Sequence, residues 1–529
     1  MTTEFETEPT EAQGRLDLYG PLALLAVILC MIAAHLGLLR VPYFWDETYF
    51  APAARDLFQT GKLVPFTVPV ESHPPLLYLW LAIWWKLFGF SIVVARSAML
   101  AVSALTLVAV YRLARLFSTG AVPIVVTALT AMYPVFFVES ALVQLDMAAA
   151  GLTLWGLVAC LQGRRWETGI FFTLAVLAKE TAVVAPCAVL AGDFLLTLLA
   201  RRHGIGDAIR SVLKAAIPLL LPFLALLCWF AWLYHVSGTV FGDPYYVRYN
   251  LDGAARPTRI FLAGVQHLWH LLGFLNLFVL TGLAAIIFAA RSRLSPSDTP
   301  EQSSRGWLIF TFLIAGYVLM LSIIGGVTLA RYLLPIYPIV ILACVVGLSA
   351  RVKWWPAIAG LTAAAFVAGL FPYTNRFLFR RDDNLAYLDY VSLHQAAIES
   401  FANGKKVKVF TVWPGSSELS VPWLGYTKQP LEVTEIDSFT RQDLQDDRHE
   451  RPEYILMFPR AACKAENPFR REHRPQGDYF HATRELSPDD VAALMNARVI
   501  YRAQRRCDWV AVLKLEDAGA VPHEKTASQ

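Results

Sequence analysis

Long apolar stretches separated by short charged loops fill residues 19–372 of this 529-residue chain. A helix needs about 20 apolar residues to cross the hydrocarbon core of a bilayer, so the pattern predicts a polytopic α-helical membrane domain. Charged residues make up only 17% of the chain, whereas roughly 25% is usual for soluble proteins. We expect eleven spans, over residues 20–39, 92–117, 121–138, 141–161, 167–178, 181–200, 213–235, 260–290, 307–325, 331–350 and 354–372.

The basic residues cluster in every second loop between these spans or at the span ends beside it. They are Arg112, Arg115, Arg164, Arg165, Arg201, Arg202, Arg210, Lys214, Arg291, Arg293, Arg305, Arg351 and Lys353. Loops with an excess of Lys and Arg stay in the cytoplasm. The pattern therefore predicts a cytoplasmic N-terminus and an extracytoplasmic C-terminus for a multi-pass protein of the inner (plasma) membrane.

The Trp-rich run 76–89 is short for a span, and we expect it to form a helix at the membrane interface.

Three parts of the chain differ in composition. Residues 1–18 are polar and predict a cytoplasmic tail, because no small-residue cleavage site follows the first apolar run. Residues 19–372 form the membrane domain, and residues 373–529 resemble an ordinary soluble domain. In this last part, alternating patterns predict strands within 405–413, 453–458, 497–503 and 508–515, and a helix over 388–402. We therefore expect a small extracytoplasmic α/β domain, in which Cys463 and Cys507 either pair or stay as unrelated thiols.

Ionisable side chains at the ends of the apolar segments all map to the predicted outer side. Such groups are costly near a membrane and usually face a cavity. They are Asp46, Glu47, Glu71, His73, Glu139, Asp146, Lys179, Glu180 and Arg331. Glu139 and Asp146 are seven residues apart, which on one helix places both on the same face. A cluster of this composition, drawn from five chain regions, predicts an active site or a path for a polar substrate.

Each of these residues also has a simpler interpretation. Asp46 and Glu47 can be plain loop charges, with Tyr43, Phe44 and Trp45 as interface anchors. Asp146 and Lys179 can form a structural pair, Lys179 and Glu180 a local surface pair, His73 can start a helix, and Arg331 can anchor a helix end at the interface. Outside this group, Asp243 and Tyr245–Tyr246 can belong to a plain loop. Asp382–Asp383 and Asp446–Asp447 can be solvated surface charge.

Five sequence blocks together resemble the GT-C-type membrane glycosyltransferases, in particular the protein O-mannosyltransferases and the lipid A aminoarabinose transferases. They are WDETYFAPAARDLFQTGKLV from residue 45, HPPLLYLWLAIWWKLFG from 73, LDMAAAGLTLW from 145, LAKET from 177 and RYLLPIYP from 331. Their order and spacing match over roughly residues 19–372. The first block is fairly specific, and the blocks that begin at residues 145 and 331 are informative only in combination.

The resemblance implies a transferase of the GT39/GT83 type that uses a sugar linked to a polyprenyl phosphate. It implies Asp46 as the catalytic base with Glu47 beside it, and His73, Asp146, Lys179, Glu180 and Arg331 as substrate-binding residues. The aminoarabinose branch tends to have a Lys at position 73. Because an imidazole holds a phosphate less well than an ammonium, aminoarabinose, mannose and other hexoses all stay open. The acceptor hydroxyl can belong to a lipid, a glycan or a protein.

The chemistry of sugar transfer explains why such residues are needed. A carboxylate can take the acceptor proton, a second can stabilise the oxocarbenium-like transition state, and a cation can receive the leaving phosphate, for which the planar Arg331 is suited. A single displacement inverts the anomeric centre. The chain has no phosphate-binding glycine loop for a nucleotide donor, and no basic tract that predicts a nucleic-acid partner. No metal-binding pattern stands out, although His73 with Glu71 or Asp146 leaves a divalent metal open.

The main alternative is a transporter or flippase for a lipid-linked sugar. Transporters more often carry internal repeats and place charges near mid-membrane depth. Here the charges gather at one face, which favours an enzyme. A non-catalytic scaffold explains the soluble part but leaves Asp46, Asp146 and Arg331 without a role.

Overall fold

The computed structural model describes residues 11–70, 72–199, 216–242, 256–290, 301–324, 328–371, 380–402, 407–446, 451–460, 485–506 and 508–516, with the side chains of 11–18 and 301–303 left out. Glu71, Asp243, Tyr245–Tyr246, Asp447 and both cysteines of the expected pair, Cys463 and Cys507, lie outside the described residues. The chain divides into two compact units. The helical unit holds the described residues of Met1–Arg40, Tyr49–Asn375 and Asp382–Asn384, and the C-terminal unit those of Val41–Thr48, Arg376–Arg381 and Leu385–Gln529.

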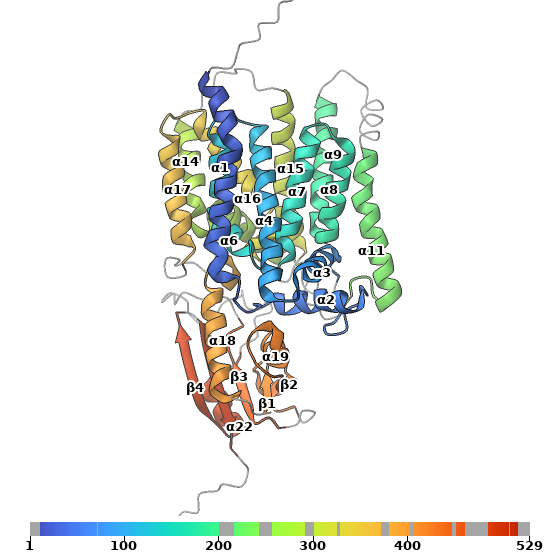
Figure 1. Cartoon of the computed structure of the whole chain (residues 1–529), viewed down its shortest axis with the longest axis vertical. Helices are drawn as coiled ribbons and strands as arrows, with labels where there is room; N and C mark the ends of the chain where they lie inside the picture. The colour runs from blue at the N-terminus through green and yellow to red at the C-terminus, as the bar shows by residue number, and fades with distance from the viewer. Residues whose placement is uncertain are drawn as a thin grey trace, which may run out of the picture. The chain divides into compact units, whose positions relative to one another are not determined.

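The helical unit is a bundle of long apolar helices that run roughly side by side (Figure 1). Its α-helices are α1 (Glu11–His35), α2 (Glu47–Thr60, whose first two residues belong to the C-terminal unit), α3 (Leu76–Phe88), α4 (Ile92–Arg115), α5 (Val122–Met132), α6 (Pro134–Glu139), α7 (Leu145–Leu161), α8 (Arg165–Ala178), α9 (Val184–Leu199), α11 (Leu221–Ser237), α13 (Pro257–Leu272), α14 (Leu277–Ala290), α15 (Glu301–Ile323), α16 (Tyr337–Ser349) and α17 (Trp355–Gly369).

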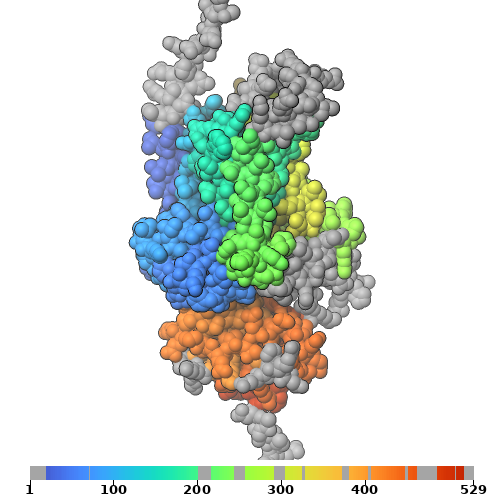
Figure 2. Space-filling view, turned by 90° about the vertical axis from the view of Figure 1, so that its right-hand side faces the viewer, coloured from blue at the N-terminus to red at the C-terminus, as the bar shows by residue number. Residues whose placement is uncertain are grey.

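Six helical segments of the described chain are long and apolar enough to cross a membrane. They are Tyr19–Leu38, Ile92–Arg115, Glu180–Leu199, Ile217–Ser237, Pro257–Ala290 and Ser304–Ile323. Shorter apolar helices lie between and after them, so the chain is a multi-pass membrane protein, and the count of eleven spans stays a prediction. Figure 2 shows α11, in green, on the surface of the bundle. Leu224, Leu227 and Tyr234 of this helix are each more than half exposed, so its outer face is apolar. Soluble proteins rarely expose such a surface.

Two short helices lie where the sequence predicts an outer loop. α3 confirms the helix expected over 76–89; it buries Leu77, Leu81 and Trp85 and exposes Leu87 and Phe88. α2 is a helix that we did not expect, and it runs across one end of the bundle (Figure 1). Asp56 of α2 is fully buried and accepts hydrogen bonds from the backbone N–H groups of residues 66 and 67. These bonds hold the segment that follows α2 against the helix.

The expected placement of Glu139 and Asp146 on one helix face is wrong. Glu139 is the last residue of α6, and Asp146 lies in the first turn of α7. Between the two helices the backbone at Gln144 is extended, with φ −122° and ψ 143°. The helical periodicity that relates positions seven residues apart therefore does not apply across this break.

The C-terminal unit is an α/β domain, as predicted, around a five-stranded sheet of order β2–β1–β3–β5–β4. The strands are β1 (Lys408–Thr411), β2 (Glu432–Glu435), β3 (Tyr454–Met457), β4 (Ala497–Arg505) and β5 (Asp508–Leu515), and the helices are α18 (Tyr387–Ala402), α19 (Gly415–Ser420), α20 (Arg441–Leu444) and α22 (Pro488–Met495). β1 is parallel to β2 and β3, whereas β5 is antiparallel to β3 and β4. Of these strands, only β2 was not predicted; its sequence EVTE holds two charged residues, and none of its four residues is buried.

Candidate functional site

Four buried charges from distant parts of the chain form one ion-pair cluster in the helical unit. Lys179 Nζ lies 2.6 Å from Asp146 Oδ1, and Arg331 Nε lies 3.4 Å from Asp146 Oδ2. Arg331 Nη1 also donates to Asp382 Oδ2. Each of the four side chains is at most 11% exposed. We call this group the ion quartet; it holds two positive and two negative charges.

The helix ends explain why Asp146 and Lys179 meet. α7 and α8 are joined by a short turn and lie side by side (Figure 1), so the first turn of α7 is next to the last turn of α8. Close packing is possible because Gly156 of α7 has no side chain, and a Cβ there would lie 2.4 Å from the Phe172 ring of α8. Asp146 is in the first turn of α7, and Lys179 caps the end of α8. The helix dipoles favour an acid and a base at these two positions.

The cations of the quartet share an aromatic neighbour. The Tyr332 ring centroid is 4.0 Å from Lys179 Nζ and 5.7 Å from Arg331 Cζ. Arg331 itself is in a 3₁₀ turn, Ala330–Leu333, that precedes α16. Burying charges in a low-dielectric interior costs several kcal/mol per ion unless partners compensate, and here each of the four charges has at least one partner of opposite sign.

His73 and Glu180 form a second pair in the helical unit. His73 Nδ1 lies 2.9 Å from Glu180 Oε2, and the His73 side chain is 8% exposed. The loop that carries His73 is fixed by Trp229 of α11, whose indole Nε1 donates to Ser72 O at 2.8 Å. Because Lys179 and Glu180 are consecutive, the quartet and the His73–Glu180 pair are one residue apart in the chain.

Gln144 is a buried polar residue that the sequence analysis did not identify. Its side chain is fully buried, and neither amide atom has a hydrogen-bond partner among the described residues. It lies two residues before Asp146, at the N-cap of α7. Buried side-chain amides in folded proteins nearly always have partners. The only available sequence signal was a glutamine inside an apolar run.

Asp46 and Glu47 belong to the C-terminal unit and are described within it. Glu47 is fully buried, and its Oε2 accepts a hydrogen bond from Phe44 N–H at 2.8 Å. Asp46 is partly exposed. Tyr43 and Phe44 are 0% and 2% exposed, and Phe44 packs on the rings of Tyr387 and Tyr390. Tyr43 and Phe44 are therefore not interface anchors, because their rings are buried, whereas Trp45 is partly exposed.

Several of the simpler interpretations also fail on burial. Arg331 is 4% exposed, which excludes a snorkelling anchor, and Lys179 pairs with Asp146 and not with Glu180. Asp382 and Asp383 are 8% and 3% exposed, so they are not solvated surface charges. Asp382 is in the quartet, and it is the member that the sequence analysis missed. The structural contact expected between Asp146 and Lys179 is present.

The described residues offer no ready metal site. No three His, Cys, Asp or Glu side chains lie together in the described part of the chain. His73 pairs with Glu180, and Asp146 pairs with two cations. A metal requirement stays untested.

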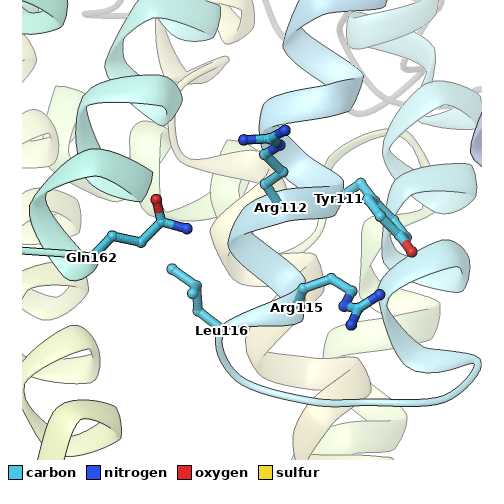
Figure 3. Close-up of a pocket in the computed structure, with 5 residues that line it drawn as sticks. All are labelled: Tyr111, Arg112, Arg115, Leu116 and Gln162. Carbon is cyan, nitrogen blue, oxygen red and sulfur yellow. The ribbon is translucent and has the colours of Figure 1, made fainter. Parts of the chain in front are cut away.

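A shallow hollow lies near the other end of α7. Tyr111, Arg112, Arg115, Leu116 and Gln162 line it (Figure 3). Gln162 caps the C-terminal end of α7, about 24 Å along the helix from Asp146 at a rise of 1.5 Å per residue. The two arginines lie in the last turn of α4, at the end predicted to face the cytoplasm. This hollow is therefore a separate feature from the ion quartet.

Comparisons with known proteins agree with the predicted resemblance. Residues 72–235 match the family model described as dolichyl-phosphate-mannose-protein mannosyltransferase. No curated protein sequence matches the chain.

Among solved structures, ArnT from Cupriavidus metallidurans bound to undecaprenyl phosphate matches with a TM-score of 0.54 at 16% identity, over 95% of this chain and 98% of that chain. The apo state of the same protein matches with a TM-score of 0.51 at 15% identity, over the same shares of both chains. The oligosaccharyltransferase of Archaeoglobus fulgidus in the apo form gives a TM-score of 0.47 at 12% identity, over 83% of this chain and 69% of that chain.

The matches to ArnT extend over both units of the chain. They confirm the predicted fold class, a helical membrane domain of the GT-C type followed by a small α/β domain. The predicted resemblance to the superfamily of protein O-mannosyltransferases and aminoarabinose transferases is likewise confirmed.

Proposed function

We propose that the chain is an inverting glycosyltransferase that moves a sugar from a polyprenyl-phosphate donor to a hydroxyl acceptor on the extracytoplasmic side of the inner membrane. The observation that carries the proposal is the ion quartet, a costly set of buried charges in a membrane protein with the fold of ArnT. ArnT has been solved with undecaprenyl phosphate bound, which supports a lipid phosphate as the leaving group here.

The proposed step is a single displacement. The Asp46 carboxylate takes the proton of the acceptor hydroxyl while that oxygen attacks the anomeric carbon. The bond between that carbon and the phosphate oxygen breaks, and the lipid phosphate leaves with the electron pair. The sugar thereby changes its anomeric configuration. Glu47, whose carboxylate is bound to Phe44 N–H, holds the backbone around the base.

The quartet supplies the cations for the leaving phosphate. Arg331 presents a planar fork that suits phosphate oxygens, and Lys179 adds a second positive charge nearby through Asp146. The Asp382 carboxylate already accepts the hydrogen bond that Arg331 Nη1 donates. A phosphate that binds this guanidinium has to compete with the Asp382 carboxylate, since both are anions that accept from the same donors.

This competition predicts opposite effects of two conservative substitutions. Arg331→Lys keeps the charge but removes the fork, so we expect weaker binding of polyprenyl phosphate. Asp382→Asn removes the competing charge, so we expect tighter binding. Equilibrium binding of the lipid phosphate to purified protein in detergent measures both. Two variants that shift affinity in the same direction would argue that the quartet is only structural.

Gln144 gives a second prediction at the start of α7. An amide buried without a described partner is available for a sugar hydroxyl, and a hydrogen bond between uncharged groups is worth roughly 0.5–1.5 kcal/mol. We expect Gln144→Leu to lower kcat/KM for the donor about two- to tenfold, and to leave the melting temperature unchanged or raised, because it deletes an unsatisfied polar group. Steady-state kinetics measures the change in kcat/KM, and thermal unfolding measures the change in melting temperature. Full activity in Gln144→Leu would show that Gln144 only fills space in the core.

One assay separates the enzyme from the transporter alternative. Purified protein in detergent is given a polyprenyl-phosphate sugar and an acceptor extract, and free lipid phosphate is measured. A transferase releases lipid phosphate without a membrane to cross. A flippase moves the intact donor across proteoliposomes and releases none. Parallel reactions with mannose, another hexose and aminoarabinose donors identify the sugar.

A further inference from the structure

The loop that carries Asp46 is built into the C-terminal unit. We call residues 41–48 the base loop. Tyr43 N–H donates to Leu424 O at 3.0 Å, which ties the loop to the backbone of the C-terminal unit. The Tyr43 ring lies edge-on to Trp423 with 5.9 Å between centroids. These contacts join positions that are far apart in the sequence and leave the loop little freedom.

Trp45 is held in an unusual backbone conformation immediately before Asp46. Its φ is +50°, a left-handed value that costs energy for a bulky side chain. Its ring lies 5.7 Å from Tyr390 and 5.7 Å from Trp413, and the Arg381 guanidinium carbon lies 5.2 Å from the ring centroid. Strain of this kind persists only where the surroundings fix it, and it gathers at functional sites.

A buried polar network supports these rings. Tyr390 OH donates to Glu418 Oε1 at 2.9 Å, and His394 Nδ1 lies 2.6 Å from Glu418 Oε2. Burial raises the pKa of the Tyr390 phenol well above its ordinary value, so this phenol keeps the proton that it donates. Arg381 donates to Asp508 Oδ1 at 2.7 Å, with both side chains at most 5% exposed. Polar networks in a low-dielectric interior hold side chains in one arrangement.

The base loop also closes on itself around Asp46. Phe44 N–H donates to Glu47 Oε2 at 2.8 Å. A second set of bonds also spans Asp46: the Thr48 N–H and hydroxyl donate to Trp45 O at 2.8 and 2.7 Å. The residues before and after Asp46 are thus bonded to each other, and α2 starts immediately after it.

We propose that the C-terminal unit positions the candidate base: Arg381, Tyr390 and Trp413 clamp Trp45, and Trp45 sets the backbone from which Asp46 reaches the acceptor. This inference rests on the proposed function, in which Asp46 takes the proton. Its consequence is a role in the chemical step and not in donor binding. Trp45, Arg381 and Tyr390 are positioning residues, because they act through Asp46.

The kinetic test uses Trp45→Ala with Trp45→Phe as the conservative variant. A displacement of about 1 Å at a reacting group can cost about 10²-fold in rate, so we expect Trp45→Ala to lower kcat by that factor while KM for the donor stays within twofold. Trp45→Phe keeps an aromatic ring in the clamp and should recover most of the rate. A rise in KM at constant kcat would overturn the proposal.

A double-variant cycle separates positioning from general damage. If Trp45 acts only through the Asp46 carboxylate, Trp45→Ala has little further effect once Asp46→Asn is present. If the two losses multiply, Trp45 acts on something else and the inference is wrong.

A measurement without activity keeps this inference distinct from the proposed function. Hydrogen exchange of the peptide covering residues 41–48 reports on the Tyr43 and Phe44 N–H bonds. We expect faster exchange in Arg381→Lys than in the wild type, and no change in Arg502→Lys, whose exposed ion pair with Asp489 lies in the same unit. Equal exchange in both variants would show that Arg381 does not hold the loop. If Asp46→Asn proves fully active while exchange rises, the assignment of the base fails and the clamp stands.

Discussion

Asp46→Asn is expected to abolish release of lipid phosphate from a polyprenyl-phosphate sugar. The amide has nearly the shape of the carboxylate but cannot accept a proton at neutral pH, and general-base catalysis contributes about 10²–10⁴-fold. Asp46 is partly exposed, so the substitution should leave folding and expression intact. Single-turnover measurement of lipid phosphate with saturating donor detects the loss in the chemical step itself.

A matched substitution in the same unit serves as the control. Asp489→Asn makes the same atomic change at a side chain that is 74% exposed and paired with Arg502. We expect its activity to equal that of the wild type. Full activity in Asp46→Asn would remove this residue from the mechanism, and equal loss in both variants would point to damage of the C-terminal unit.

Asp146→Ala is expected to destabilise the protein strongly and to inactivate it. Removing one partner from a buried ion pair typically costs about 3–5 kcal/mol, because the remaining charge is left buried. Here Lys179 loses its 2.6 Å contact and Arg331 loses one of its two carboxylates. Thermal unfolding in detergent measures the loss. Asp193→Ala is the comparison, since the Asp193–Arg305 pair is more exposed, at 22% and 31%, and should cost less.

A compensated variant separates stability from function. Asp146→Leu combined with Lys179→Met removes one charge of each sign and leaves Arg331 with Asp382. Replacing a buried ion pair by apolar groups of similar size is often neutral or stabilising. We therefore expect the double variant to regain stability but not activity. If it regains both, the Asp146–Lys179 pair serves the fold alone.

The sequence was sufficient to predict the fold class, because hydropathy and basic loops follow directly from the physics of the bilayer. It was also sufficient to single out Asp146, Lys179 and Arg331, since ionisable groups in apolar segments are conspicuous. It missed α2, which contains Pro52 and three charged residues, and β2, whose sequence EVTE carries two charges and buries no residue.

Two of the remaining errors have one cause, which is that burial depends on tertiary contacts. Asp382 follows Arg380 and Arg381 in a charged run that is typical of a surface, yet Asp382 pairs with Arg331 and Arg381 with Asp508. Tyr43 and Phe44 have the composition of an interface belt, yet they are buried, and their rings pack on Trp423, Tyr387 and Tyr390 of the C-terminal unit. Glu139 and Asp146 were placed on one helix, since nothing in the run ESALVQLD marks the break at Gln144.

The central claim is that the ion quartet receives the lipid phosphate, and a structure with bound polyprenyl phosphate tests it most directly. We expect the phosphate oxygens within hydrogen-bond distance of the Arg331 guanidinium, with the Asp382 carboxylate displaced from Nη1. A phosphate bound instead to Arg112 and Arg115, in the hollow near the other end of α7 (Figure 3), with the quartet unchanged, would contradict the account.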